Sequence, residues 1–206
     1  MAQEVTLALS LLNKDGSIKV GQAHSPGYAA AVEGRRFLAV SASGGIALIV
    51  PAAGGGHPTL WNPRGSKVNL FIRRLVLSWV SGANAPGAVE WALTTAAGAQ
   101  ASTGASTAIL TATAVAVTNV ITGGPVNTQA IWSPTTNTFT AAPVFLRPAG
   151  ISLFTGIGAT AVAPFKLEAE YDDFGVGPDT AVSLCFQTTT TTAVFQVAIT
   201  FDEEPV

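Results

Sequence analysis

Charged residues are scarce in this 206-residue chain. They make up 11% of the sequence, with 10 Lys and Arg against 12 Asp and Glu, whereas a globular domain has about 25%. No charged residue occurs among the 56 residues from Trp91 to Leu146. The net charge of −2 provides no basic surface for a phosphate backbone, so we expect no nucleic acid as a partner.

Cysteine and histidine are scarce as well. Cys185 is the one cysteine, so an internal disulfide is excluded, and its apolar neighbours in VSLCFQ favour a position in the core. The two histidines, His24 and His57, stand beside prolines. A zinc site needs three or four ligands at short spacings, and the GxSxG motif of a serine nucleophile is missing. We therefore expect a protein that is not an enzyme and that has no metal or other cofactor.

Long uninterrupted apolar runs are also missing. Thr, Ser, Asn and Gln interrupt the uncharged segment throughout, whereas a membrane-spanning helix needs about 20 nearly continuous apolar residues. The first residues lack the basic start and the cleavage pattern of a signal peptide. We expect no membrane association, and synthesis in the cytoplasm without export.

From residue 35 onward, short apolar runs rich in Val, Ile and Thr alternate with clusters of Gly, Pro, Asn and Ser. This pattern predicts an all-β fold, an antiparallel sandwich or barrel of about ten short strands. Residues 1–34 are only weakly periodic, and we expect them to form an N-terminal arm. The β-domain then covers residues 35–206.

The expected strands have unusually neutral faces. In Ala193–Phe201, the alternation puts Phe195 and every second residue after it on one face, and Gln, Ala and Thr on the other. Strands that face water usually carry charges, which keep sheets soluble and prevent edge pairing. Neutral outer faces therefore predict that other protein covers much of this surface, as in an oligomer or a lattice.

Two adjacent cations, Arg73 and Arg74, interrupt the apolar strand that ends at Trp79. Apolar residues alternate in one phase up to Ile72 and in the opposite phase from Leu75. One extra residue in a strand, a β-bulge, restores the register in this way. Alternatively, the two arginines pair with a carboxylate across a subunit contact, to which the guanidinium geometry is suited.

An acidic run, KLEAEYDDFG, contains the candidate partners of these arginines. In a strand, Glu168, Glu170 and Asp172 share one face. Such a face is most often simply solvated. It could also hold a cation such as calcium through oxygen ligands, or pair with Arg73 and Arg74 within or between subunits.

Trp61 lies in LWNPRG, which we expect to form a turn. A tryptophan exposed on a turn could stack on a sugar ring. This one residue is the basis of a glycan-binding alternative.

The block LWNPRGSKVNLFIRRLVLSWVSG, followed by GAVEWAL, resembles structural proteins of tailed bacteriophage virions. The uncharged Ala/Thr/Gly-rich middle and the closing AVFQVAITFDEEPV are similar to such proteins in style. The resemblance implies a jelly-roll-like sandwich of the decoration or cement type, a homotrimer on the outer surface of a capsid. Its partners would be the major capsid protein and further copies of the chain.

We therefore expect a non-enzymatic virion protein that stabilises the outside of a phage capsid. The alternative is a receptor- or glycan-binding fibre module of the virion. The residues expected to form subunit or capsid contacts are Arg73, Arg74, Glu168, Glu170 and Trp61.

Overall fold

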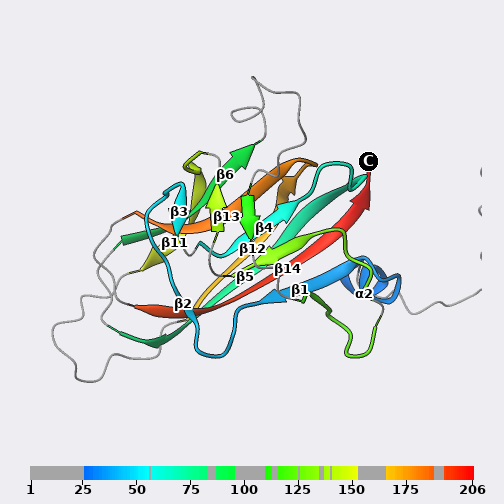
Figure 1. Ribbon diagram of the computed structural model, residues 1–206. Helices are drawn as coiled ribbons and strands as arrows, with labels where there is room; N and C mark the ends of the chain where they lie inside the picture. Colours follow the sequence, from blue (N-terminus) through cyan, green and yellow to red (C-terminus); the bar gives the residue numbers. More distant parts are fainter. Residues whose placement is uncertain are drawn as a thin grey trace, which may run out of the picture.

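The computed structural model describes residues 26–55, 57–82, 87–95, 110–112, 116–124, 126–134, 137–139, 141–152, 166–187 and 193–206. Over these residues the chain is an antiparallel β-sandwich with one short helix (Figure 1), which confirms the predicted fold class. The elements are α2 (Pro26–Val32), β1 (Arg36–Val40), β2 (Ile46–Ala47), β3 (Gly54–Gly55), β4 (Thr59–Asn62), β5 (Val68–Ser81), β6 (Gly87–Thr95), β7 (Leu110–Ala112), β8 (Thr118–Asn119), β9 (Ile131–Ser133), β10 (Asn137–Phe139), β11 (Val144–Ser152), β12 (Lys166–Val176), β13 (Thr180–Phe186) and β14 (Val194–Pro205).

Two large sheets form the layers of the sandwich. Sheet 1 has the strand order β12-β5-β14-β1-β8, with β2 also paired to β14, and sheet 2 has the order β11-β6-β13-β4-β9. A small third sheet has the order β3-β10-β7.

The eight main strands pair in a nested pattern, first with last: β1 with β14, β4 with β13, β5 with β12, and β6 with β11. An antiparallel ribbon folded over in this way is a jelly roll.

The core lies between the inner faces of the two sheets. On β14 the inward residues Phe195, Val197, Ile199 and Phe201 have no exposed surface, as their alternation predicts. From sheet 2, Trp91 is also fully buried. Burial of each such side chain stabilises the fold by about 1.5–3 kcal/mol.

Strand β5 contains the bulge that the change of phase predicts. Ile72 pairs with Phe201 of β14, but Arg74 pairs with Thr200, so Arg73 is the extra residue. On the other side of β5, three residues of β12, Tyr171 to Asp173, stand opposite Arg73. The bulge keeps Ile72 and Leu75 in the core and leaves both arginines on the outer face.

Three sequence predictions need correction. Trp61 lies on strand β4, not in a turn, because its segment pairs with β13 and β9. The segment AHSPGY, which its Ser, Pro and Gly predict to be a turn, contains helix α2 instead. The helix begins at Pro26, since proline suits the first position of a helix. About ten short strands were expected, but fourteen are described, and β5 alone has 14 residues. The predicted arm lies outside the described residues up to residue 25.

Candidate functional site

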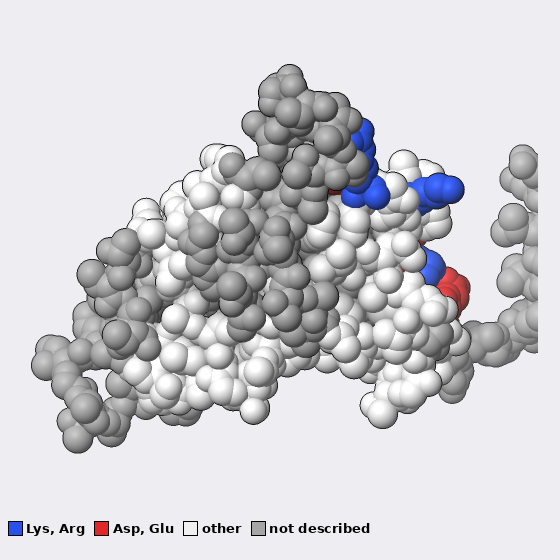
Figure 2. All heavy atoms as spheres, viewed as in Figure 1, with Lys and Arg blue, Asp and Glu red and all other residues white. Residues whose placement is uncertain are grey.

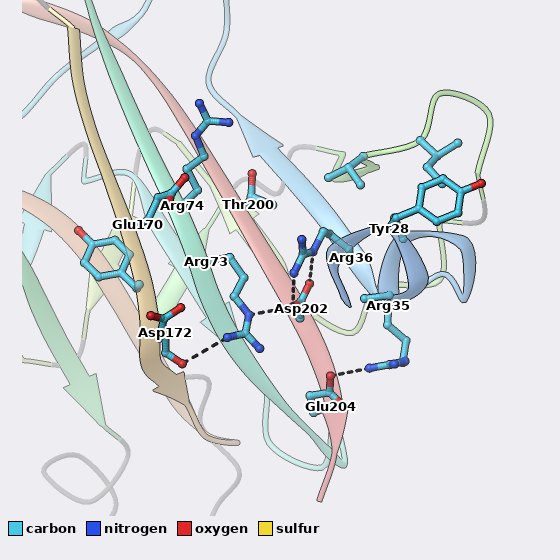
Figure 3. Close-up of a pocket in the computed structure, with 16 residues that line it drawn as sticks. Tyr28, Arg35, Arg36, Arg73, Arg74, Glu170, Asp172, Thr200, Asp202 and Glu204 are labelled. Atoms are coloured by element: carbon cyan, nitrogen blue, oxygen red, sulfur yellow. Dashed lines mark hydrogen bonds and ion pairs between the residues drawn. The ribbon is translucent and has the colours of Figure 1, made fainter. Parts of the chain in front are cut away.

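Asp202, on the outer face of β14, is the centre of a cluster of ion pairs (Figure 3). Arg36 of β1 binds it through two hydrogen bonds, Nε to Oδ1 at 2.6 Å and Nη2 to Oδ2 at 2.7 Å. Arg73 donates from Nε to Oδ2 at 2.8 Å, and from Nη1 to the backbone oxygen of Asp172 at 3.2 Å. The bulge therefore places Arg73 so that it joins β5, β12 and β14.

These contacts determine the charge state of Asp202. Desolvation by itself would raise the pKa of this carboxyl, because only 3% of its side chain is exposed. The hydrogen bonds from Arg36 and Arg73 outweigh it, so the pKa of Asp202 lies below its ordinary value. The hydrogen bond to Asp202 likewise raises the pKa of Arg36, against desolvation. Asp202 and Arg36 are therefore both charged at neutral pH.

Two more arginines beside this cluster have partners within the chain. Arg35 bonds to Glu33 and to Glu204 at 2.5 Å each. Arg74 contacts Glu168.

Lys166 also pairs with Glu168, at 2.6 Å. Hydrogen bonds from Lys166 and then Arg74 lower the pKa of Glu168. The arginine pair thus has intrachain partners, and a contact of these residues with another subunit stays a prediction.

A groove of about 790 Å³ lies over this cluster. Arg36, Asp202 and Arg73 form its floor in Figure 3. One wall comes from β12, with Glu170 and Asp172, and the other from α2 and the 120–121 segment. The groove is therefore lined by charge on one side and by largely apolar groups on the other.

Of the five predicted contact residues, four lie together in or beside this groove: Arg73, Arg74 and Glu170 line it, and Glu168 pairs with Arg74. Trp61 is separate from them, on β4 of sheet 2. It is partly buried, and its indole nitrogen is buried without a hydrogen-bond partner among the described residues.

The acidic run alternates as predicted up to Tyr171. Glu168 and Glu170 are exposed, and Ala169 and Tyr171 turn inward. Asp173 contacts Arg147 at 3.3 Å. Among the described residues, no three His, Cys, Asp or Glu side chains gather where they could hold a metal ion.

Cys185 and His57, 128 residues apart, meet in the interior. The Sγ–Nδ1 distance is 3.4 Å, and both residues are fully buried. Burial raises the pKa of the thiol to about 12, with a smaller contribution from Glu90, and burial lowers the pKa of His57. A buried neutral thiol beside a neutral imidazole is a structural pair, because the thiolate is the reactive form.

Sequence reasoning missed Asp202, Arg36 and Glu203. Buried Glu203 accepts hydrogen bonds from Thr128 Oγ1 at 2.5 Å and from the amides of Gln129 and Ala130 at 2.8 and 3.1 Å. The sequence does contain a signal for Asp202 and Glu203: the alternation of β14 continues past Phe201 into the acidic end of the chain.

The face of the molecule that Figure 2 shows is largely uncharged over its described residues. Figure 2 shows visible charges gathered at one end of this face, the end at which α2 and the C-terminus lie in Figure 1. Val144, Phe145 and Leu146 of β11 are 69, 44 and 46% exposed. These three consecutive apolar residues lie on the edge strand of sheet 2.

A comparison of the chain with protein-family models, curated proteins and solved structures found no match. No helix among the residues that the structure describes is long and apolar enough to cross a membrane.

Proposed function

We propose that this protein is a non-enzymatic structural component of a bacteriophage virion. In this role it binds the outer surface of the capsid as a homotrimer and stabilises the shell by adding contacts between neighbouring capsid subunits. The partners are the major capsid protein and two further copies of the chain. Many weak contacts suffice for such a role, because simultaneous engagement raises the effective concentration at each one.

The apolar edge of β11 is the observation that carries this proposal. An edge strand offers unpaired backbone groups, and soluble proteins usually protect it with charges. Here Val144, Phe145 and Leu146 are exposed instead. A consecutive exposed apolar stretch on a strand edge is typical of a surface that another protein covers.

Arg147, the cation next to this apolar stretch on β11, contacts residues of its own chain. The Arg147 guanidinium lies 5.2 Å from the ring centroids of both Tyr171 and Phe174, and 3.3 Å from Asp173. Cation–π contacts of this kind are favourable for arginine. These contacts hold the side chain of Arg147, a residue of β11, against β12. The exposed residues Val144 to Leu146 therefore form an uncharged edge.

The jelly-roll topology agrees with the virion class to which the sequence bears a resemblance. The glycan-binding alternative has less support, because Trp61 lies in a strand and is partly buried. A side chain in that position does not offer the open ring face that stacking on a sugar needs. We therefore favour the capsid-binding role.

A pair of substitutions tests the apolar edge. Phe145→Lys puts a charge on the edge of β11, and we expect it to reduce the molar mass in light scattering toward that of the monomer. Val126→Lys is the matched control, since Val126 is also exposed, at 53%, but lies outside the described strands. Equal masses for the two variants would show that the apolar edge of β11 is not part of a contact between copies of the chain.

The virion location has a separate test. Antibodies raised against the purified chain are applied to phage particles whose genome encodes this chain. We expect gold label on the outside of the heads. Label confined to tail fibres would support the fibre-module alternative, and no label on intact particles would contradict both.

A further inference from the structure

His57 lies between sheet 2 and the small third sheet. Alternate residues of β13 belong to the main core, so Cys185 points to the outer side of sheet 2, yet it has no exposed surface. His57 covers it there, with Nδ1 at 3.4 Å from Sγ. On its other side, the imidazole packs against Phe139 of β10, with ring centroids 5.8 Å apart.

We propose that His57 is an acid-sensitive switch, and that protonation of its Nε2 atom releases the third sheet from the outer face of sheet 2. This conformational change goes beyond the proposed virion function. It does not depend on that function either, because it concerns contacts within one chain.

The first observation is the course of the chain around His57. The backbone oxygens of Ile49 and Pro58 accept hydrogen bonds from amides of β13, at 2.9 Å each. Between these two positions the chain leaves sheet 2 and forms β3, which pairs with β10 of the third sheet. His57 directly precedes Pro58, so it stands where this connection returns to sheet 2.

The second observation is the hydrogen bonding of the imidazole. The amide of Ala52 donates to Nε2 at 3.3 Å, so Nε2 provides the lone pair, and the proton of the neutral ring is on Nδ1. Nδ1 is thereby directed at Sγ of Cys185, which is a weak acceptor. The neutral ring thus joins the outgoing part of the connection, at Ala52, to β13.

Protonation disturbs this arrangement at a defined atom. The added proton occupies Nε2, so the new N–H and the amide N–H of Ala52 oppose each other. A buried donor without an acceptor is unfavourable, and so is a buried imidazolium. Movement of the connection away from His57 relieves both, because it admits water, and β3 carries its pairing with β10 along.

Among the described residues, the titratable groups on the strands around His57 are Cys185 of β13 and Glu90 of β6. Burial raises the pKa of the thiol to about 12, with a smaller contribution from Glu90, so Cys185 stays neutral and provides no counter-charge. Glu90 stands opposite Cys185 in the register of the two strands and is partly exposed, so solvent screens its charge. The described residues of β4, β9, β10 and the 49–55 segment include no titratable side chain.

The direction of the pH dependence follows from the burial of the ring. Desolvation keeps the pKa of His57 below its ordinary value of 6.5 in the closed state. The open state therefore binds more protons between these two pKa values, and closure weakens as the pH falls below 6.5. Because one proton is involved, the open population rises by at most about tenfold for each pH unit. Asp202 does not titrate in this range, since its pKa lies below 3.8.

The reactivity of Cys185 measures this opening, because it is the one cysteine of the chain and is fully buried. We would follow its reaction with 4,4′-dithiodipyridine, relative to a peptide of sequence VSLCFQ at the same pH, which corrects for the intrinsic reactivity of the thiol. Between about pH 7 and pH 5 we expect the relative rate to rise about tenfold in the wild-type chain.

Two variants assign this rise to one imidazole. In His57→Gln the relative rate should not change with pH, because the amide oxygen of Gln can accept the Ala52 bond and does not titrate. His24→Gln is the matched control at the second histidine of the sequence, and it should retain the rise. An equal rise in His57→Gln, or no rise in the wild-type chain, would overturn the inference.

Nuclear magnetic resonance of the wild-type chain provides a second test that needs no variant. The ¹⁵N shifts of the ring should show the proton on Nδ1 at neutral pH and a pKa below 6.5. As the ring becomes protonated, the Ala52 amide should lose its protection from hydrogen exchange, whereas the amide of Ile199 in β14 should keep its protection. A ring proton on Nε2 at neutral pH, or unchanged protection of Ala52, would contradict the switch.

Discussion

Asp202 and Glu203 are adjacent carboxylates on β14 that are 2 and 6% exposed. Their side chains lie on opposite faces of sheet 1, as successive residues of a strand must. Asp202 is neutralised by two arginines, whereas Glu203 accepts bonds from a hydroxyl and two backbone amides.

The two environments stabilise different parts of the fold. On the outer face, charge neutralisation holds the bulge of β5 against β1 and β14. On the inner face, neutral donors attach the 128–130 segment to the end of β14. Asp202 and Glu203 thus lie in different environments, although they are adjacent in the sequence. Only Asp202, on the outer face, is paired with cations.

Asp202→Asn should have the largest effect. The substitution leaves Arg36 and Arg73, which are 22 and 31% exposed, without their carboxylate. Removal of one partner from a largely buried ion pair decreases stability by about 3 kcal/mol. Urea unfolding measures the change, with the exposed Asp173→Asn as control. A loss no larger than that of the control would mean that the cluster does not stabilise the fold.

Glu203→Gln should have a smaller effect. The amide oxygen can still accept some of the three hydrogen bonds, but the amide nitrogen now faces donors. We expect a loss of about 1–2 kcal/mol in the free energy of unfolding. If the loss equals that of Asp202→Asn, the distinction between the two environments is wrong.

Acidification should remove the stabilisation of the fold that Asp202 provides. Because the folded-state pKa of Asp202 lies below the ordinary value of 3.8, the unfolded chain binds more protons between these two pKa values. The stabilisation by Asp202 is therefore complete above the ordinary value and is lost as the pH falls through the folded-state value. Unfolding curves at decreasing pH should show the difference between wild type and Asp202→Asn shrinking below about pH 4. A constant difference would contradict the charge state assigned to Asp202.

Arg74→Gln should have the smallest effect. Arg74 and Glu168 have 46 and 34% of their side chains exposed, and such ion pairs are screened by salt. We expect a slight decrease in the unfolding midpoint at low salt that disappears at high salt. A large, salt-independent decrease would place Arg74 with Arg73 in the stabilising cluster.

The predictable features are those that depend on local alternation. The phase change around Arg73 and Arg74 correctly predicted a bulge, and the pattern from Phe195 to Phe201 correctly predicted a core face. Both signals arise because one face of a strand is buried, so register determines which residues are apolar.

The features that were missed depend on long-range pairing. Asp202 meets Arg36 only because β14 lies beside β1, and His57 reaches Cys185 only because the nested ribbon brings distant segments together. Trp61 belongs to a four-residue strand, too short for its alternation to distinguish it from a turn. No local pattern contains these relations.

The solution mass of the full-length protein tests the claim of neutral self-assembly most directly. We would measure it by light scattering at low and high salt, since contacts between apolar, uncharged surfaces are not screened. We predict three times the chain mass of 20.9 kDa under both conditions. A monomer at both salt concentrations would contradict the claim that the neutral surface is an interface between copies of this chain.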